Sequence, residues 1–255
     1  MNIFNNYAEF YDAYYSEKNY NAEIDFILKL ANKNGLLNPK NVLDIGCGTG
    51  GHIVPLAQKK IFVKGFDLSE NMIDYAKNKI QKENLQQYSK VEIGNAIDYR
   101  DNNKYDLVIA MFAVMGYLNK TEDILSAIET VKTHLNQNGL FIFDFWFGPA
   151  VLHNLPETRI QEFELNNKKI IRLVQPELNV LENTVTVNYK MIKFNSENSI
   201  EQSSESHKMR YFFINELGYF FNINGLKIID ICPFMELNKK PNINDWNVTI
   251  VAKQK

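Results

Sequence analysis

The chain has 255 residues and a net charge of −2, and 45% of its residues are hydrophobic and 13% aromatic. This length fits one large domain or one domain with an insertion, and the composition excludes a disordered chain. Acidic and basic residues are interspersed without a basic tract, so nucleic acid is not an expected partner.

The sequence also lacks the usual signals for membrane insertion, export or metal binding. No apolar run reaches the roughly 20 residues of a membrane span, and residues 1–7 have neither the basic nor the apolar region of a signal peptide. The two cysteines, Cys47 and Cys232, are not spaced for a disulfide framework or a zinc site. We therefore expect a cytoplasmic protein that needs no metal and has no membrane partner.

Helix and strand signals alternate along the first 145 residues. Apolar residues such as Ile24, Ile27 and Ala31 lie on one face of a predicted helix. In chain order, the predicted elements are a helix over 21–34 that stops at Gly35, a strand at Val42–Ile45, a helix with Pro55 near its start, a strand at Ile61–Phe66, a helix capped by Ser69, strands at Val91–Ile93 and Tyr105–Ala110, a helix over 121–135 and, after a turn at Gly139, a strand at Leu140–Phe145. This alternation predicts a parallel sheet with helices on both faces.

The pattern changes after residue 150. Over residues 158–212, β-branched and aromatic residues alternate with polar ones, which predicts half-buried antiparallel strands with turns at Asn166-Asn167 and Asn195-Ser196. A helix over 214–223 and an antiparallel pair of strands, Leu226–Ile231 and Trp246–Ala252, close the chain. The expected fold is α/β: a Rossmann-like, mostly parallel sheet of seven strands from a core of residues 1–150 and 211–255, and an antiparallel β insertion at 151–210.

A glycine-rich loop follows the first predicted strand. Gly46, Gly48 and Gly51 satisfy the G-x-G-x-x-G pattern, and Asp67 stands about twenty residues on, where a dinucleotide-binding fold places its ribose-binding acid. An NAD(P)-dependent oxidoreductase is therefore one reading. However, Asp44 precedes the glycines, and its carboxylate would repel a pyrophosphate but accept a hydrogen bond from a ligand amine. Together with Asn95 after the third strand, it favours a cationic nucleoside, S-adenosylmethionine (SAM).

Several segments resemble known methyltransferases. Val42–Gly50, Phe66–Ser69, Gly94–Ala96 and Asp106–Tyr117 resemble the successive motifs of class I SAM-dependent methyltransferases. Less specifically, Tyr7–Asp12, Met111–Tyr117 and Glu205–Arg210 resemble the desosamine/mycaminose type of nucleotide-sugar N-methyltransferases, which also carry a β insertion before the last helix and strands.

The resemblance implies a set of cofactor contacts. The glycines would let the backbone approach the methionine part of SAM, Asp67 would hold both ribose hydroxyls, and Tyr11 and Tyr20 would form part of a lid. Asn95 stands where the family usually has Asp, and its amide can still serve as donor or acceptor. The expected cofactor-binding residues are Tyr11, Tyr20, Asp44, Gly46, Cys47, Gly48, Gly50, Asp67, Leu68, Met72, Asn95, Ala96, Ile97, Met111 and Phe112.

The acceptor side is less sharply defined. Tyr117 and His207 are the expected catalytic residues, and the expected substrate contacts are Tyr117, Trp146, Phe147, His207 and Arg210. Each has a structural alternative: hydrophobic cover for Trp146 and Phe147, and a structural pair for His207 and Arg210. Asp144 either points into the cleft or has a structural role. Related sugar N-methyltransferases meet the amine with a tyrosine near the N-terminus, where this chain has Ile3-Phe4, so O-methylation stays open.

Three functions follow from these patterns. The first is a SAM-dependent methyltransferase acting on N or O of a small polar acceptor, such as a sugar, a nucleotide-linked sugar or a polysaccharide precursor, with the insertion covering the substrate side. The second is the NAD(P)-dependent oxidoreductase. The third is a binding module of the same fold without catalysis. A homodimer stays open in all three.

Overall fold

The computed structural model describes residues 18–165, 168–194 and 199–255. Its centre is a seven-stranded sheet in the order β10-β11-β5-β4-β1-β2-β3. The strands are β1 (Asn41–Ile45), β2 (Phe62–Asp67), β3 (Ser89–Ile93), β4 (Tyr105–Ala110), β5 (Leu135–Trp146), β10 (Leu226–Pro233) and β11 (Asn247–Gln254). Strands β1 to β5 pair parallel, whereas β11 pairs antiparallel with both β5 and β10. The predicted Rossmann-like sheet is confirmed.

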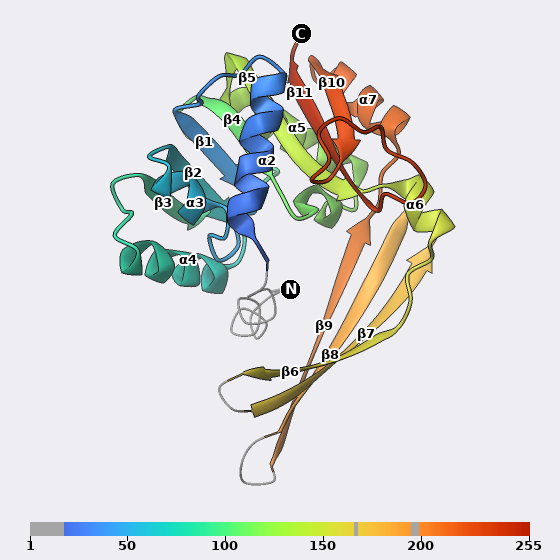
Figure 1. The fold of residues 1–255 in the computed structure, drawn as a ribbon. Coiled ribbons are helices and arrows are strands. Elements are labelled where there is room, and N and C mark those ends of the chain that lie inside the picture. The colour runs from blue at the N-terminus through green and yellow to red at the C-terminus, as the bar shows by residue number, and fades with distance from the viewer. Residues whose placement is uncertain (1–17, 166–167, 195–198) are drawn as a thin grey trace.

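Helices cover both faces of this sheet (Figure 1). The buried residues of α2 (Tyr20–Lys33), α3 (Ile53–Gln58) and α4 (Glu70–Lys82) join one apolar cluster, and those of α5 (Thr121–His134) and α7 (Ile214–Ile223) join the other. The hydroxyl of Ser69 accepts a hydrogen bond from the N–H of Met72, as expected for the cap of α4. Gly35, just beyond α2, has φ +92°, a conformation that favours glycine.

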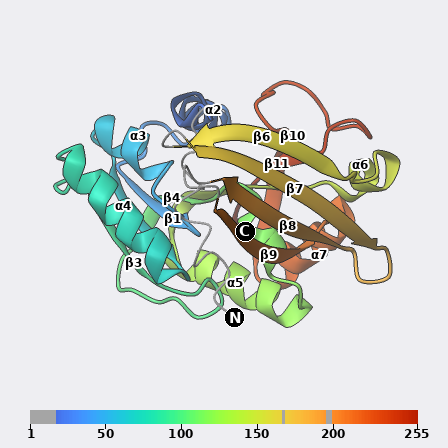
Figure 2. The same ribbon diagram turned by 90° about the horizontal axis from the view of Figure 1, so that it is seen from below.

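A separate four-stranded antiparallel sheet, in the order β6-β7-β8-β9, interrupts the core. It follows the short helix α6 (Gly148–His153) and contains β6 (Arg159–Leu165), β7 (Lys168–Asn179), β8 (Thr184–Phe194) and β9 (Ile200–Arg210). Figure 1 shows it projecting from the core, and in the view from below the four strands run side by side in front of the core (Figure 2). The turns predicted at Asn166-Asn167 and Asn195-Ser196 lie outside the described residues.

Two local expectations were wrong. Strand β5 begins at Leu135, directly after α5, so Gly139 lies inside the strand and not in a turn before it. The pairing with β4 shifts there, and a Cβ on Gly139 would lie only 3.0 Å from the carbonyl oxygen of Tyr105. Glycine is therefore needed for a close backbone approach within a strand. Helix α6 was missed because six residues are too few for a helical period to emerge.

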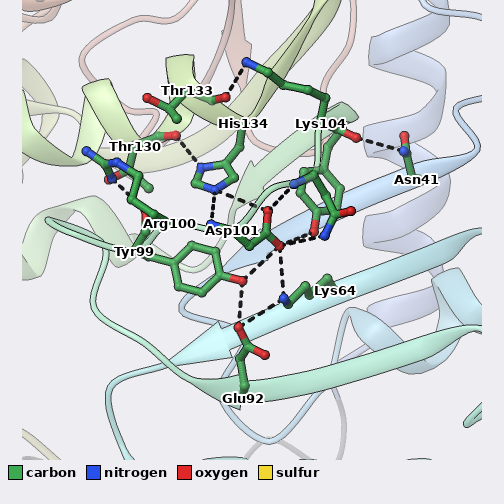
Figure 3. A network of polar contacts seen from close by, with 12 residues as sticks. Asn41, Lys64, Glu92, Tyr99, Arg100, Asp101, Lys104, Thr130, Thr133 and His134 are labelled. Carbon is green, nitrogen blue, oxygen red and sulfur yellow. Dashed lines mark hydrogen bonds and ion pairs between the residues drawn. The ribbon is translucent and has the colours of Figure 1, made fainter.

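A polar network links β2, β3 and the first residue of β4 (Figure 3). The carboxylate of Asp101 accepts hydrogen bonds from Lys64 Nζ at 3.0 Å, from the hydroxyl of Tyr105 at 2.9 Å and from the hydroxyl of Tyr99 at 3.2 Å. Lys64 also pairs with Glu92 at 3.1 Å. The side chains of Lys64 and Asp101 are only 13% and 11% exposed, so this ion pair is protected from solvent.

His134 links the same network to α5. Its Nδ1–H donates to the carbonyl oxygen of Thr130 at 2.7 Å, and its Nε2 accepts from the backbone N–H of Asp101 at 3.0 Å. These partners assign a neutral imidazole with the proton on Nδ1. Burial lowers the pKa of His134, which is consistent with this form. The network therefore fixes α5 against the sheet without a charge on the histidine.

We expect Asp101→Asn to lower the free energy of unfolding at pH 7 by about 2 kcal/mol, the scale of hydrogen bonds to a charged group. Burial alone would raise the pKa of Asp101, but hydrogen bonds from Asn103, Lys64 and Tyr105 outweigh it and hold the pKa well below its usual range. The stabilisation is therefore fully present above the unfolded value of about 3.9 and is lost as pH falls through the lower folded pKa.

Urea unfolding at pH 7 and pH 3 measures both effects. The difference between wild type and variant should be smaller at pH 3. Asp98→Asn, an exposed residue close by in the same segment, is the matched control and should change little. A difference that grows in acid would contradict the assignment.

Candidate functional site

The glycine-rich loop turns sharply at the carboxyl end of β1. The backbone N–H groups of Gly46 and Cys47 both donate to the carbonyl oxygen of Phe66, at 2.9 and 3.0 Å, so the loop begins pinned to β2. Gly46, Gly48 and Gly50 have φ values of +68°, +53° and +79°, the left-handed region where other residues are strained. The alternating glycines are thus required by the turn itself.

The glycines differ in what surrounds them. A Cβ on Gly46 would lie 2.6 Å from Cγ1 of Val114, and one on Gly51 would lie 2.4 Å from the ring of Tyr20. By contrast, a Cβ on Gly48 would meet no atom within 4 Å. Any side chain at Gly46 or Gly51 would clash with neighbouring atoms, so packing requires glycine at both positions. Gly48 instead presents its backbone to open space. A ligand can approach the chain closely at that point.

Asp67 fastens this loop to the start of α4. Its Oδ2 accepts from the N–H of Gly48 at 2.9 Å, and its Oδ1 accepts from the N–H of Ser69 at 2.9 Å. Burial raises the pKa of Asp67, and these backbone donors partly offset the rise. Because each carboxylate oxygen has a second lone pair, both can still accept from a ligand. Asp67 is therefore fixed in place beside the open side of Gly48.

Asp44 lies directly below the loop with 1% of its surface exposed. Its Oδ2 has no hydrogen-bond partner among the described residues. Burial, and then the neighbouring charge of Asp67, raise the pKa of Asp44 well above its ordinary value. A buried carboxyl oxygen without a partner is costly. This group therefore suits a ligand that brings a cation or a hydrogen-bond donor, and not one that brings a phosphate.

The side of the site expected to hold an adenine is apolar and partly open. Leu68, after β2, is 67% exposed, and Ile93, paired with Asp67 across the strand ends, is 54% exposed. Met72, the other residue expected beside the adenine, is only 2% exposed. Asn95 accepts from the N–H of Ile97 at 3.3 Å and so braces the turn after β3. Ile93 was missed because it reads as an ordinary strand residue.

The backbone after β4 is strained. Phe112 and Ala113 have φ values of +72° and +55°, and neither is a glycine. Each left-handed residue costs roughly 1–2 kcal/mol. Asp144, on the neighbouring strand β5, is 3% exposed, and its Oδ1 accepts from the N–H of Ala113 at 3.0 Å. Of the two roles open to Asp144, the structure assigns the structural one, which is to hold this turn.

The segment before α2 packs over the same region. The ring of Tyr20 meets the ring of His52 edge to face, with centroids 5.1 Å apart. Lys18 places its Nζ 3.6 Å from the centroid of the Phe112 ring. Lys18 carried no signal in the sequence, because one lysine before a helix is unremarkable. Tyr11 lies outside the described residues.

Two of the expected acceptor residues meet. The hydroxyl of Tyr117, at the end of the 3₁₀ helix η1 (Val114–Tyr117), lies 2.8 Å from Nδ1 of His207 on β9. Nε2 of His207 lies 3.2 Å from Oε2 of Glu205. His207 is 3% exposed, and the ring of Tyr189 meets it edge to face. Glu205 was missed, although its spacing of two from His207 places both on one face of a strand.

The other expected substrate residues are engaged in packing or in an ion pair. Phe147 is 7% exposed within the core, and Trp146 packs against Trp246 with ring centroids 6.1 Å apart. Arg210 pairs with Glu216 at the start of α7. The hydrophobic cover and the structural pair are therefore the better readings for these three, and His207 does not pair with Arg210.

Neither a membrane nor a metal is indicated by the described residues. No helix among them is long and apolar enough to cross a membrane, and no three of their His, Cys, Asp or Glu side chains gather as metal ligands would.

The chain is similar in sequence to known methyltransferases. Residues 42–139 match the profile of a family described as methyltransferase domain. A curated relative, the dTDP-3-amino-3,4,6-trideoxy-α-D-glucopyranose N,N-dimethyltransferase of Streptomyces venezuelae, is 30% identical over 145 residues. That alignment covers 56% of this chain and 58% of the relative, so the chain spans little more than half the length of the relative.

Two solved structures resemble the fold over nearly its whole length. A SAM-dependent methyltransferase from Clostridium acetobutylicum ATCC 824 gives a TM-score of 0.83 at 21% identity and covers 98% of both chains. DesVI of Streptomyces venezuelae gives 0.80 at 20% identity, over 98% of this chain and 99% of that one. Residues 42–139 therefore resemble the methyltransferase-domain family, and the chain as a whole shares the fold of these two solved structures.

Proposed function

We propose that this protein is a SAM-dependent methyltransferase that acts on a small polar acceptor, a sugar or nucleotide-linked sugar. The observation that carries the proposal is the glycine loop, where Gly48 faces open space and donates to Asp67, and where Asp44, a neighbour of Asp67, keeps an oxygen without a partner among the described residues. An NAD(P) pyrophosphate at this loop would approach the buried acid, and the family match supports a methyltransferase. The oxidoreductase alternative therefore has no support.

The residues of the site would hold the cofactor by charge and by shape. SAM, when bound, supplies a methyl group on a positively charged sulfur. Asp67 would accept from the ribose hydroxyls, Leu68 and Ile93 would contact the adenine, and Asp44 would accept from the amine of the methionine part. Because the leaving group is a neutral thioether, most of the rate enhancement can come from alignment of the acceptor with the methyl group.

The acceptor would lie between the core and the four-stranded sheet, near Tyr117 and His207. If Tyr117 donates its O–H to Nδ1 of His207, then Nε2–H of His207 faces Glu205, which is one consistent tautomer. In this arrangement Tyr117 takes a proton from an acceptor amine or hydroxyl and passes its own to His207. The Glu205 carboxylate then stabilises the imidazolium. This arrangement serves N-methylation and O-methylation alike.

The remaining features fit this assignment. The net charge of −2 favours a small acceptor over nucleic acid. Residues 151–210 would form an insertion that covers the substrate side of a core made by residues 1–150 and 211–255. Both cysteines are free and buried, as is usual for a protein of the reducing cytoplasm.

Calorimetric titration tests the cofactor assignment. SAM should bind, and NAD should not. Asp67→Ala should weaken SAM binding by roughly 1.5–3 kcal/mol, because it removes hydrogen bonds to a charged group. Asp74→Ala, an exposed acid on α4, is the control. Tight NAD binding by the wild type would overturn the proposal, and unchanged SAM affinity in a folded Asp67 variant would overturn the ribose role.

Gly48→Ala should separate ligand binding from folding. We expect it to cost about 1–2 kcal/mol of stability, the price of a left-handed alanine, and to weaken SAM binding by about tenfold or more, because the methyl group fills the ligand space. Gly35→Ala is a matched control, since that glycine is also left-handed with no atom within 4 Å of a Cβ. It should lose similar stability but keep SAM affinity. Equal SAM affinity in the two variants would contradict the assigned space.

A screen of nucleotide-linked amino- and hydroxy-sugars with methyl-labelled SAM would identify the acceptor. With that acceptor, Tyr117→Phe should lower turnover by about a hundredfold, as expected for the loss of a proton-transfer group, and leave SAM affinity nearly unchanged. Tyr219→Phe, 63% exposed on α7, is the control. The reverse pattern would place Tyr117 in the cofactor site, and transfer to no acceptor would favour a binding module.

A further inference from the structure

The side chain of Lys18 packs over the candidate site and is largely shielded from solvent. Its side chain is 13% exposed and lies just before α2. The ammonium nitrogen lies 3.6 Å from the centroid of the Phe112 ring and 4.9 Å from that of Tyr20, close enough for favourable cation–π contact with both. Oε2 of Glu23 lies 3.4 Å away and fixes the third side.

The supports of Lys18 are themselves rigid. Glu23 is 6% exposed and is also bound to Nε2 of His52 at 2.7 Å. Phe112 sits on the strained turn that Asp144 holds. A long side chain between two rings and a buried carboxylate has lost most of its rotamer freedom in advance. Such preorganisation is useful where a charge must meet a ligand.

The charges around Lys18 are complementary to an amino acid. The methionine part of SAM carries an ammonium, a sulfonium and a carboxylate. Asp44, which keeps an oxygen without a partner among the described residues, provides negative charge for these cations, and Asp144 adds negative charge to the region while it holds the Phe112 turn. The carboxylate of the ligand would be repelled by these same acids unless a cation lay beside it. Lys18 places one beside Phe112, which is one of the residues expected to bind the cofactor.

We propose that Lys18 binds the carboxylate of the methionine part of SAM. This inference rests on the proposed function and deepens it by assigning a residue to one group of the cofactor. Lys79 is the competing cation, because its Nζ lies 3.3 Å from Oγ1 of Thr49 in the same loop. However, Lys79 lies in the last turn of α4, whereas Lys18 contacts the ring of Phe112.

The test compares SAM with decarboxylated SAM, which keeps the sulfonium, the amine and the nucleoside but lacks the carboxylate. Calorimetry should show that Lys18→Met weakens SAM binding by about 10- to 100-fold, the range for loss of a charged hydrogen bond, and leaves the affinity for decarboxylated SAM unchanged. Lys18→Arg should retain most of the SAM affinity. Lys79→Met should bind both ligands as the wild type does. Thermal unfolding of each variant verifies that it is folded.

The outcomes separate the two proposals. A wild-type protein that binds neither ligand overturns the proposed function and the role of Lys18 with it. A wild type that binds SAM, with Lys18→Met weakening both ligands equally or neither, overturns the role of Lys18 alone. Selective loss of SAM in Lys79→Met would assign the carboxylate to Lys79 instead.

Discussion

Three carboxylates at one edge of the parallel sheet, two of them buried, are the constraint on which the rest of the site depends. Asp44, Asp67 and Asp144 stand at or near the carboxyl ends of β1, β2 and β5, and burial raises the pKa of each. Two of them are stabilised by backbone N–H groups, and Asp44 keeps an oxygen without a partner among the described residues. This arrangement is unfavourable for the empty protein and favourable for a cationic ligand.

The same carboxylates shape the backbone around them. Asp67 holds the glycine loop against the start of α4, and Asp144 holds the left-handed turn at Phe112 and Ala113. That turn leads directly into η1, at whose end Tyr117 stands. The strained turn therefore fixes the position of Phe112, which is expected to contact the cofactor, and of Tyr117, which is expected to contact the acceptor. Strain that the surroundings hold in this way is common at functional sites.

The four-stranded sheet contributes what the core lacks. Strand β9 brings His207 to Tyr117, 90 residues away in sequence, and places Glu205 on the same face behind it. Without β9, Tyr117 would lose its hydrogen bond to His207. In the proposed function, the insertion therefore supplies a catalytic side chain as well as covering the substrate side. The seven-stranded sheet would bind the cofactor, and the four-stranded sheet would help to bind the acceptor.

Local sequence determined most of the fold. The local features are the spacing of apolar residues, about every 3.6 residues in helices and every second residue in strands, the Ser69 cap and the left-handed glycines. They allowed β1, β4 and α7 to be placed from the sequence almost to the residue. Gly139 and α6 could not, because the first depends on the approach of β4 and the second is too short to show a period. The glycine loop with Asp44 and Asp67 was readable because its residues lie close together in the chain.

Tertiary structure decided the rest of the site. Several features of the site depend on contacts between distant segments: the pairing of Tyr117 with His207, the place of Lys18 over Phe112, the packing of Trp146 against Trp246 and the ion pair of Arg210 with Glu216. A single sequence encodes such contacts only through the packing of whole elements. Burial raises the pKa values of the three carboxylates and leaves Oδ2 of Asp44 without a hydrogen-bond partner among the described residues, and it arises only once the sheet and its helices have packed together.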